Sequence, residues 1–205
     1  MTDYHFYRPE DGHRLPHSPL NAIIAPRPIG WISTIGNDGT RNLAPYSFFN
    51  LINYDPPLIA FASSGWKDTV ANIEATGEFV WNLATRAQAE AMNATSANVE
   101  PGVDEFALAG LDTLPSSIVA PPRVAGSPVH FECKMTQLIR LENRHGNAID
   151  QWLVIGEAVG IHIDPAMLED GVYQTARSVP ITRGGGPADY FAITEDALFR
   201  MRRPD

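Results

Sequence analysis

The chain has 205 residues, 44% of them hydrophobic and 19% charged, so it can bury one ordinary core. A formal net charge of −9 argues against binding nucleic acid through a general positive field. Cys133 is the only cysteine, which excludes an intrachain disulfide and a cysteine-based metal cluster. The first residues lack the basic and apolar regions of a signal peptide, and no apolar run reaches the ~18 residues of a membrane span. We therefore expect a cytoplasmic protein that does not bind membranes.

The two ends of the chain differ from the rest. Residues 1–20 carry Tyr, His and Pro without periodicity and are predicted to form an extended N-terminal arm, while residues 196–205 form a basic tail. His13 and His17 have a spacing of four, but Pro16 opposes a helix that would pair them on a metal ion. No linker or repeat interrupts the chain, so residues 1–205 are predicted to form one domain without a metal site.

A β-hairpin is predicted in the first part of the chain. Residues 30–35 are rich in β-branched and aromatic side chains, which favours a strand. Residues 36–39 read Gly-Asn-Asp-Gly, a strong turn signal. Residues 43–50 then return as a second strand, with Pro45 marking an edge or a bulge. A short, continuously apolar strand follows at 58–62.

Helices alternate irregularly with the later strands. A helix is predicted from Asp68 or Thr69 to Thr76, with Gly77 as its left-handed cap. The next strand covers residues 79–83.

The second half of the chain adds two helix starts and a long hairpin. Residues 85–88 fit a capping box, and a short helix is predicted around 104–109. Apolar residues alternate over 129–135, which predicts a strand with one buried face, and residues 152–163 are similar. Residues 143–150 would join these two strands. Five or six strands with a few short helices favour a β-barrel decorated by helices.

The cluster Lys67, Asp68 and Thr69 is a candidate phosphate site. A helix N-terminus has free amides and the positive end of the helix dipole, so it binds phosphate readily. Lys67 would add a cation and Thr69 a hydroxyl, while Asp68 could cap the helix. Simple N-capping beside a solvated lysine is the alternative, and the local sequence leaves it open.

Other polar and aromatic residues also have ordinary interpretations. His162 fits a structural histidine on a strand, and Gly184–Gly186 fits either a phosphate-approaching backbone or a plain loop. No dinucleotide fingerprint, phosphate loop or nucleophile elbow occurs, so no catalytic residue is predicted. Strand hydroxyls, a turn amide and core aromatics account for the remaining candidates, Ser33, Thr34, Ser47, Asn50, Trp31, Phe48 and Phe49.

Taken together, these segments resemble a known family. The segments 26–34, 42–50, 55–58, 67–69 and 77–83, followed by 102–106, 109–111, 127–129 and 156–159, are similar in order and residue type to the flavin reductase-like family. The resemblance covers about residues 20–195. It implies a mainly β fold with peripheral helices, a six-stranded antiparallel Greek-key split β-barrel that binds FMN, and a homodimer with flavin near the subunit interface.

The resemblance also implies roles for single residues. The first strand would line the flavin with Trp31, Ser33 and Thr34. The isoalloxazine edge would be held by Tyr46, Ser47, Phe48 and Asn50. Lys67 and Thr69 would take the phosphate, with Asp68 beside them, and Arg183 and Tyr190 would approach the flavin or the partner subunit.

The function implied is hydride transfer from NADH or NADPH to FMN. The flavin carries that chemistry, which agrees with the lack of a catalytic acid or base in the sequence. Reduced flavin could serve a partner monooxygenase or reduce another acceptor. Two alternatives stay open: a non-enzymatic FMN-binding protein or electron carrier, and a binding module for another ligand. The sequence does not indicate which nicotinamide is used, what the final acceptor is, or whether flavin is a prosthetic group or a substrate.

Overall fold

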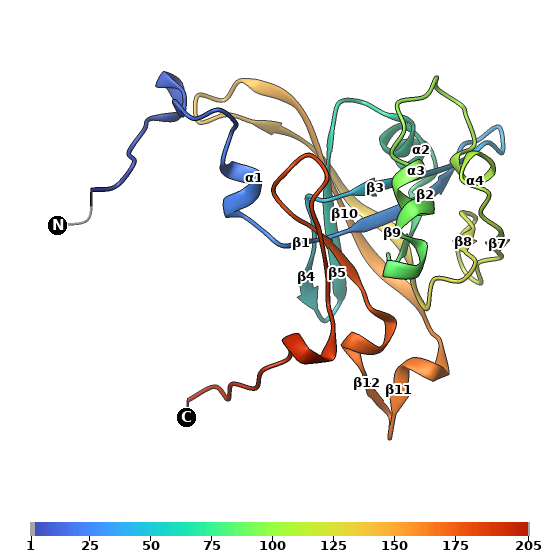
Figure 1. Ribbon diagram of the computed structural model, residues 1–205. Helices are drawn as coiled ribbons and strands as arrows, with labels where there is room; N and C mark the ends of the chain where they lie inside the picture. The colour runs from blue at the N-terminus through green and yellow to red at the C-terminus, as the bar shows by residue number, and fades with distance from the viewer. Residues whose placement is uncertain (1–2, 205) are drawn as a thin grey trace.

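One antiparallel sheet forms the centre of the molecule (Figure 1). The computed structural model describes residues 3–204; Met1, Thr2 and Asp205, which fall in the predicted arm and tail, lie outside the described residues. The sheet has seven strands in the order β3-β2-β6-β9-β10-β5-β4. Their bounds are β2 (Gly30–Ile35), β3 (Arg41–Tyr46), β4 (Phe49–Tyr54), β5 (Pro57–Ser64), β6 (Glu78–Asn82), β9 (Val129–Glu142) and β10 (Ala148–Ile163).

The two outer strands of this sheet approach each other, which gives it the shape of a barrel. β3 and β4 are joined by a corner at Ser47 and Phe48, and the carbonyl of Phe48 accepts a hydrogen bond of 2.8 Å from the amide of Ala62 on β5. The mainly β barrel predicted from the sequence is therefore confirmed, with seven strands instead of six.

Two apolar clusters hold the barrel together. The first fills its interior and includes Ile32, Phe61 and Phe79 from the sheet and Ile73 from α2 (Asp68–Thr76). The second lies between the first hairpin and the segments that cover it, and contains Trp31, Leu43, Met92, Phe106 and Val124. Trp31 thus belongs to a core, where its side chain has no exposed surface.

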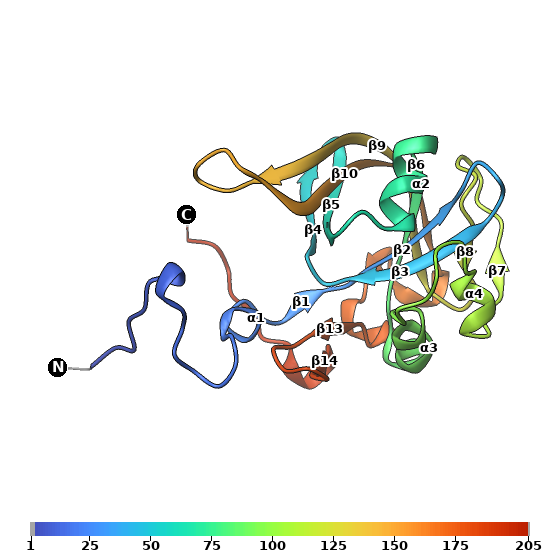
Figure 2. The ribbon, with the colours of Figure 1, turned by 90° about the horizontal axis from the view of Figure 1, so that it is seen from above.

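Short elements decorate the barrel. Figure 2 shows the β9–β10 hairpin extending away from the barrel. No helix within residues 3–204 is long and apolar enough to cross a membrane. The remaining helices are α1 (Leu20–Ile23), α3 (Ala89–Ala94) and α4 (Glu105–Leu108), with 3-10 turns at Pro9–Asp11, Arg86–Gln88, Pro165–Met167, Thr175–Ser178 and Glu195–Ala197. The small sheets are β1 (Arg27–Pro28), β13 (Ile181–Arg183) and β14 (Tyr190–Ala192); β7 (Thr113–Leu114) with β8 (Arg123–Val124); and β11 (Leu168–Glu169) with β12 (Val172–Tyr173).

The elements whose form depends on residues adjacent in the chain are present as predicted. The strand over 30–35 and the helix ending at Thr76 are both present. Gly77 adopts φ +73°, and its amide bonds the carbonyl of Ile73 at 2.8 Å, which is the left-handed cap that glycine favours. Pro45 lies on β3, which is an edge strand, so its missing N–H leaves no ladder bond unmade.

The second predicted strand, 43–50, is wrong in its extent. The chain turns a corner after Tyr46, and a separate strand, β4, begins at Phe49. The Phe49 ring stacks on Trp81 with a centroid distance of 5.6 Å, so the corner turns Phe49 against the barrel while Phe48 stays half exposed. This break adds the seventh strand.

Two predicted capping roles are wrong, although α2 begins at Asp68 as predicted. Thr85 precedes the 3-10 turn but its side chain makes no capping bond there, and the Gln88 amide donates to the carbonyl of Ala125 instead. Lys67, not Asp68, is the N-cap residue of α2. The Asp68 carboxylate accepts from the amide of Gly102 at 2.7 Å, so it ties down a neighbouring loop.

The prediction of one buried face for 129–135 is wrong as well. His130 and Glu132 point to the other face of β9 and are buried, because the loop 115–122 covers that face.

Close packing at Gly156 gives a test of the barrel core. A Cβ at this position would lie 2.4 Å from the Phe79 ring, inside the first cluster. We expect Gly156→Ala to lower the free energy of unfolding by about 1–3 kcal/mol, because overpacking forces a buried ring to move. Urea denaturation would measure the loss. Gly160→Ala is the matched control on the same strand, since its Cβ would lie 3.1 Å from the flexible end of Ile118 and at an ordinary contact distance of 3.5 Å from Glu132; an equal loss in both variants would contradict this account.

Candidate functional site

A cavity of about 250 Å³ lies at the start of α2. Strand β3 forms one wall, the N-terminus of α2 another, and the segment 95–101 a third. Four of the twelve residues predicted to bind the cofactor line it, namely Tyr46, Lys67, Asp68 and Thr69. The structure therefore brings together the predicted phosphate cluster and one end of the predicted isoalloxazine segment.

The helix start at this cavity offers several hydrogen-bond donors. The first amides of α2 have no partner within the helix, as at every helix N-terminus. The Thr69 hydroxyl is buried and accepts from the Asn42 side-chain amide at 2.8 Å, which leaves its own proton free to donate. The Asn42 side-chain amide also donates to the Thr34 hydroxyl at 3.3 Å, so Thr34 helps to orient Asn42.

A second donor is the hydroxyl of Tyr46. Its side chain is 8% exposed, and its oxygen lies near the hydroxyls of Thr69 and Ser63 but makes no hydrogen bond of good geometry to any of the residues 3–204. Burial raises the pKa of this phenol, so it stays protonated and able to donate. A buried polar group without a good hydrogen bond is costly, so an acceptor brought to this oxygen would be favourable.

Charges around the cavity are mixed. Among the described lining residues, Lys67 is the only basic one, whereas Asp68, Glu100 and Glu105 are acidic. Asp68 is held by the Gly102 amide, and Glu105 accepts from the Leu43 amide at 3.0 Å. Burial raises the pKa of Glu105, and the Leu43 bond partly opposes this shift. Lys67 therefore supplies the positive charge for an anionic group.

The corner after β3 leads out of the cavity. Phe48 is 50% exposed, and the Arg27 guanidinium lies 5.9 Å from its ring centroid. Asn50 is exposed, and its side-chain oxygen accepts from the Leu51 amide at 2.9 Å. Together with the half-buried Ser47, these residues continue the surface that begins at Tyr46.

The predicted residues of β2 lie deeper than expected. Trp31, Ser33 and Thr34 have no exposed surface. The Trp31 indole donates to the hydroxyl of Thr95 at 3.0 Å, and the Ser33 hydroxyl donates to the carbonyl of Pro122. Trp31 therefore anchors the first residue of the segment 95–101, one wall of the cavity.

Arg183 and Tyr190 lie on the small sheet, outside the cavity. The Arg183 guanidinium lies 4.9 Å from the Tyr190 ring centroid and donates to the carbonyls of Pro187 and Asp189. Arg183 is the register partner of Arg27, whose guanidinium lies over Phe48. Arg183 and Tyr190 are therefore linked through Arg27 to the corner at Ser47 and Phe48, and not to the start of α2.

The glycine run at 184–186 is a packing position. A Cβ on Gly185 would lie 2.3 Å from the Cα of Ala22, so only glycine allows this approach to α1. The Gly184 carbonyl accepts from Arg27 at 3.1 Å. These contacts fit the plain-loop interpretation.

Comparison with known proteins identifies the family. Residues 24–182 match the flavin reductase like domain, which is more than half of the chain. The chain belongs to the flavin reductase-like family. It is 37% identical over 172 residues to an uncharacterized protein of Aquifex aeolicus, covering 80% of this chain and 83% of the relative.

Two solved structures extend the comparison. Nitrilotriacetate monooxygenase component B from Bacillus cereus has a TM-score of 0.83 and 28% identity, with 98% of each chain covered. The 2-nitrobenzoate 2-nitroreductase NbaA from Pseudomonas fluorescens has a TM-score of 0.79 and 28% identity, covering 90% of this chain and 88% of that one.

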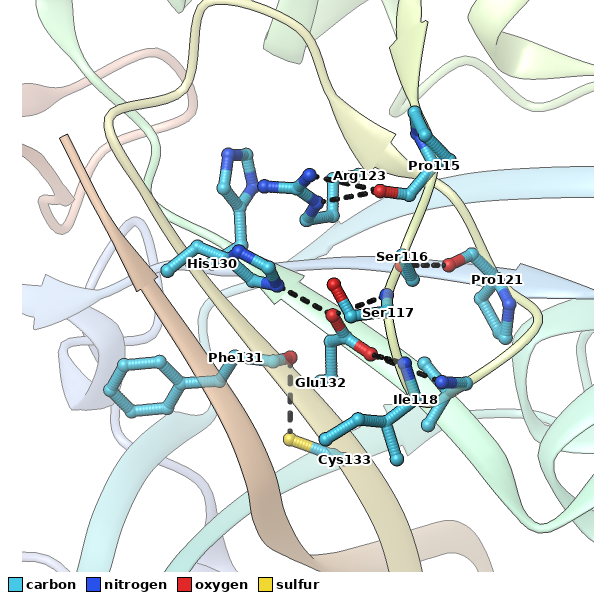
Figure 3. Close-up of polar contacts among 12 residues, drawn as sticks. Pro115, Ser116, Ser117, Ile118, Pro121, Arg123, His130, Phe131, Glu132 and Cys133 are labelled. Carbon is cyan, nitrogen blue, oxygen red and sulfur yellow. Dashed lines mark hydrogen bonds and ion pairs between the residues drawn. The ribbon is translucent and has the colours of Figure 1, made fainter.

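This flavin reductase-like chain also contains a buried acidic network, on β9 (Figure 3). The Glu132 carboxylate is 0% exposed and accepts from three successive loop amides at 2.8, 2.6 and 3.0 Å. His162 contacts it at 2.5 Å. Burial alone would raise the pKa of Glu132, but the bonds from His162 and the loop amides outweigh it and lower the pKa to about 2. The donors are the amides of Ser117, Ile118 and Val119.

The neighbouring His130 has a fixed tautomer. Asn82 donates to the Trp31 carbonyl and accepts from the Val124 amide, so its oxygen faces His130 Nδ1 at 2.9 Å and Nδ1 carries the proton. Burial, followed by the charge of Arg123, lowers the pKa of His130 to about 4. His130 and His162 are therefore structural parts of the network, as predicted for His162. Within residues 3–204 no three or more His, Cys, Asp or Glu side chains are grouped to hold a metal ion.

Sequence reasoning missed several residues of the cavity. Asn42 and Glu105 both fall in segments that carry the family resemblance, but their contacts to Thr69 and Leu43 cross long stretches of chain. The segment 95–101 is predicted only as loop, and no sequence signal marks Trp66 although it precedes Lys67.

Proposed function

We propose that this protein is an FMN-binding oxidoreductase of flavin reductase type. The observation that carries the proposal is the position of Lys67 beside the unpaired first amides of α2, in a cavity that Thr69 and Tyr46 also line. The helix start with Lys67 suits a phosphate, and a flavin oxygen that reached the buried Tyr46 hydroxyl would give that donor a partner.

Different residues bind different parts of the cofactor. Lys67, Thr69 and the first α2 amides hold the phosphate, and Asp68 keeps the adjoining loop in place through Gly102. The cavity is small for a whole ligand, so the isoalloxazine lies along the corner formed by Tyr46, Ser47, Phe48 and Asn50. Arg183 and Tyr190 border that corner through Arg27.

The residues of β2 act as positioning residues. Trp31 fixes Thr95, Ser33 fixes the loop at Pro122, and Thr34 orients Asn42 toward Thr69. Their full burial supports this role over direct contact with the cofactor.

Bound FMN would supply the chemistry for hydride transfer from NADH or NADPH. The protein's part is to bind and orient the flavin while leaving one face open. No protein acid or base is required by this function, and the cavity carboxylates Asp68 and Glu105 are engaged by backbone amides.

Partners are also part of the proposal. Strand β4 exposes Leu51, Ile52 and Tyr54 on an edge strand, and an exposed apolar edge of this kind supports a homodimer. Similarity to nitrilotriacetate monooxygenase component B supports a partner monooxygenase that uses the reduced flavin.

One experiment separates this function from its rival, an FMN-binding protein or electron carrier without nicotinamide activity. The purified protein is reconstituted with FMN and titrated with NADH and NADPH without oxygen, following the visible absorbance of the oxidised flavin. Bleaching supports the reductase. A yellow protein that neither nicotinamide bleaches would leave only the carrier, and failure to take up FMN would remove both.

The Tyr46 hydroxyl gives a specific prediction. We expect Tyr46→Phe to weaken FMN binding by about five-fold, the value of one neutral hydrogen bond, without loss of thermal stability. Stability should hold because the hydroxyl has no partner among the described residues. Isothermal titration calorimetry and thermal melts measure the two effects. Tyr4→Phe, which alters an exposed tyrosine of the N-terminal arm, is the control and should change neither.

A further inference from the structure

We propose that a second cavity, lined by apolar side chains, binds a neutral aromatic molecule of about two fused rings. This apolar cavity has a volume of about 450 Å³ and shares no lining residue with the cavity at the start of α2. Its volume lies within the range of about 300–1,000 Å³ that is usual for small-molecule sites. The proposal is independent of flavin binding.

One wall of the apolar cavity is a row of side chains across three strands of the barrel. Trp81 on β6 is the register partner of Phe131 on β9, and Phe131 is the register partner of Ile161 on β10. The Trp81 and Phe131 rings meet edge to face, with a centroid distance of 4.8 Å. The next pair on the same face of β9 and β10, Val129 and Ile163, continues the wall. The barrel therefore offers a flat ligand both aromatic and branched aliphatic surface.

Another wall comes from the small sheet. Ile29 directly follows β1, and Ile181 begins β13. Both are at most 5% exposed, so this wall belongs to the interior of the protein. Ile161 and Ile163, in contrast, are 49% and 41% exposed, so the cavity opens to solvent at the end of β10. A cavity that lies between two sheets and opens at one end suits a small molecule.

The chemistry of the lining selects against charge. None of the described residues that line the apolar cavity is charged, and the polar side chains among them are Trp81, Tyr173, Thr175 and Thr182. The Trp81 indole and the Thr182 hydroxyl donate to backbone carbonyls at 3.0 and 3.3 Å. A charged group buried here would lack a partner, and water is held well only where it finds about two to four polar partners. The hydroxyls of Tyr173 and Thr175 could pair with a neutral substituent such as a phenol hydroxyl.

A second copy of the chain is the alternative occupant. The exposed apolar edge that supports a homodimer belongs to β4, and no residue of β4 lines the apolar cavity. The cavity is therefore not part of that edge, which favours a small molecule over a second copy.

The test uses two ring compounds that differ in charge. 2-Naphthol is neutral at neutral pH, and 2-naphthoate is an anion of similar shape. Calorimetry measures the dissociation constants of both for the flavin-free and the FMN-loaded protein, and light scattering measures the number of subunits. The variant Ile161→Arg changes the mouth of the apolar cavity. The matched control is Ile149→Arg, which alters a similarly exposed isoleucine of β10 outside the cavity.

The wild-type protein should bind 2-naphthol with a dissociation constant of roughly 10–100 µM, with or without FMN, and 2-naphthoate at least about ten-fold more weakly. Ile161→Arg should reduce this preference about ten-fold, because its guanidinium gives the carboxylate a partner. Ile149→Arg should leave the preference unchanged.

Three results would overturn the proposal. The first is that the wild-type protein binds neither compound, or binds both equally. The second is competition between FMN and 2-naphthol, which would assign the ring compound to the cavity at the start of α2. The third is a lower number of subunits in Ile161→Arg without naphthol binding by the wild-type protein, which would assign the apolar cavity to a second copy. Failure to take up FMN would refute only the proposed function, because the flavin-free protein still tests this site.

Discussion

Replacing Lys67 with alanine is expected to weaken FMN binding by about 10- to 100-fold, the value of one charge-assisted hydrogen bond to phosphate. Lys67 is the only basic residue among the described residues that line the cavity, and three carboxylates lie around it. Without Lys67 the only charged side chains among the described lining residues would be acidic, and the phosphate would keep only neutral donors such as those of the helix start. Calorimetric titration of the flavin-free protein with FMN measures the change.

Riboflavin makes this prediction specific, because it lacks the phosphate. Lys67→Ala should leave the affinity for riboflavin unchanged. The affinity for FMN should fall toward that for riboflavin. Lys134→Ala serves as the matched control, since Lys134 is exposed on β9 and its ammonium pairs with Glu78, away from the cavity. Equal weakening of FMN and riboflavin by Lys67→Ala would place the phosphate elsewhere.

Features that depend on neighbouring residues could be predicted from the sequence. The turn at residues 36–39 and the cap at Gly77 require backbone conformations that favour glycine, and both are present. The cluster Lys67–Thr69 lies at a helix start because the helical pattern of the sequence begins there. That part of the candidate site therefore follows from residues that are adjacent in the chain.

Features that depend on distant contacts could not be predicted in this way. The break of the strand at Tyr46 follows from the stacking of Phe49 on Trp81, which periodicity does not encode. Glu105, the first residue of α4, contacts Leu43 at a separation of 62 residues, so the local sequence gave no sign that its carboxylate enters the cavity. The family resemblance supplied the ordered set of segments, but it did not distinguish Trp31 and Ser33, which are buried, from residues that face the cavity.

The buried Glu132 predicts how stability depends on pH. A carboxyl whose pKa falls from 4.5 to about 2 on folding contributes roughly 3 kcal/mol of stability above pH 5. That contribution is complete above the unfolded pKa and is lost as the pH falls from 4.5 to 2, because the unfolded chain takes up the proton first. His130, with its pKa lowered to about 4, adds a loss of stability that begins as the pH falls below 6.5.

Glu132→Gln should therefore lower the free energy of unfolding by roughly 3 kcal/mol at pH 7, and the difference from wild type should shrink between pH 4.5 and pH 2. Urea denaturation across this range measures it. Glutamine keeps the volume of the side chain but replaces one acceptor oxygen with an NH2 group, so at least one of the three backbone donors loses its acceptor. The matched control is Glu78→Gln, because Glu78 holds the same loop through the Ala120 amide from a more exposed position and should cost less. A pH-independent loss in Glu132→Gln would mean that shape, and not the charge of the carboxylate, holds the loop against the barrel.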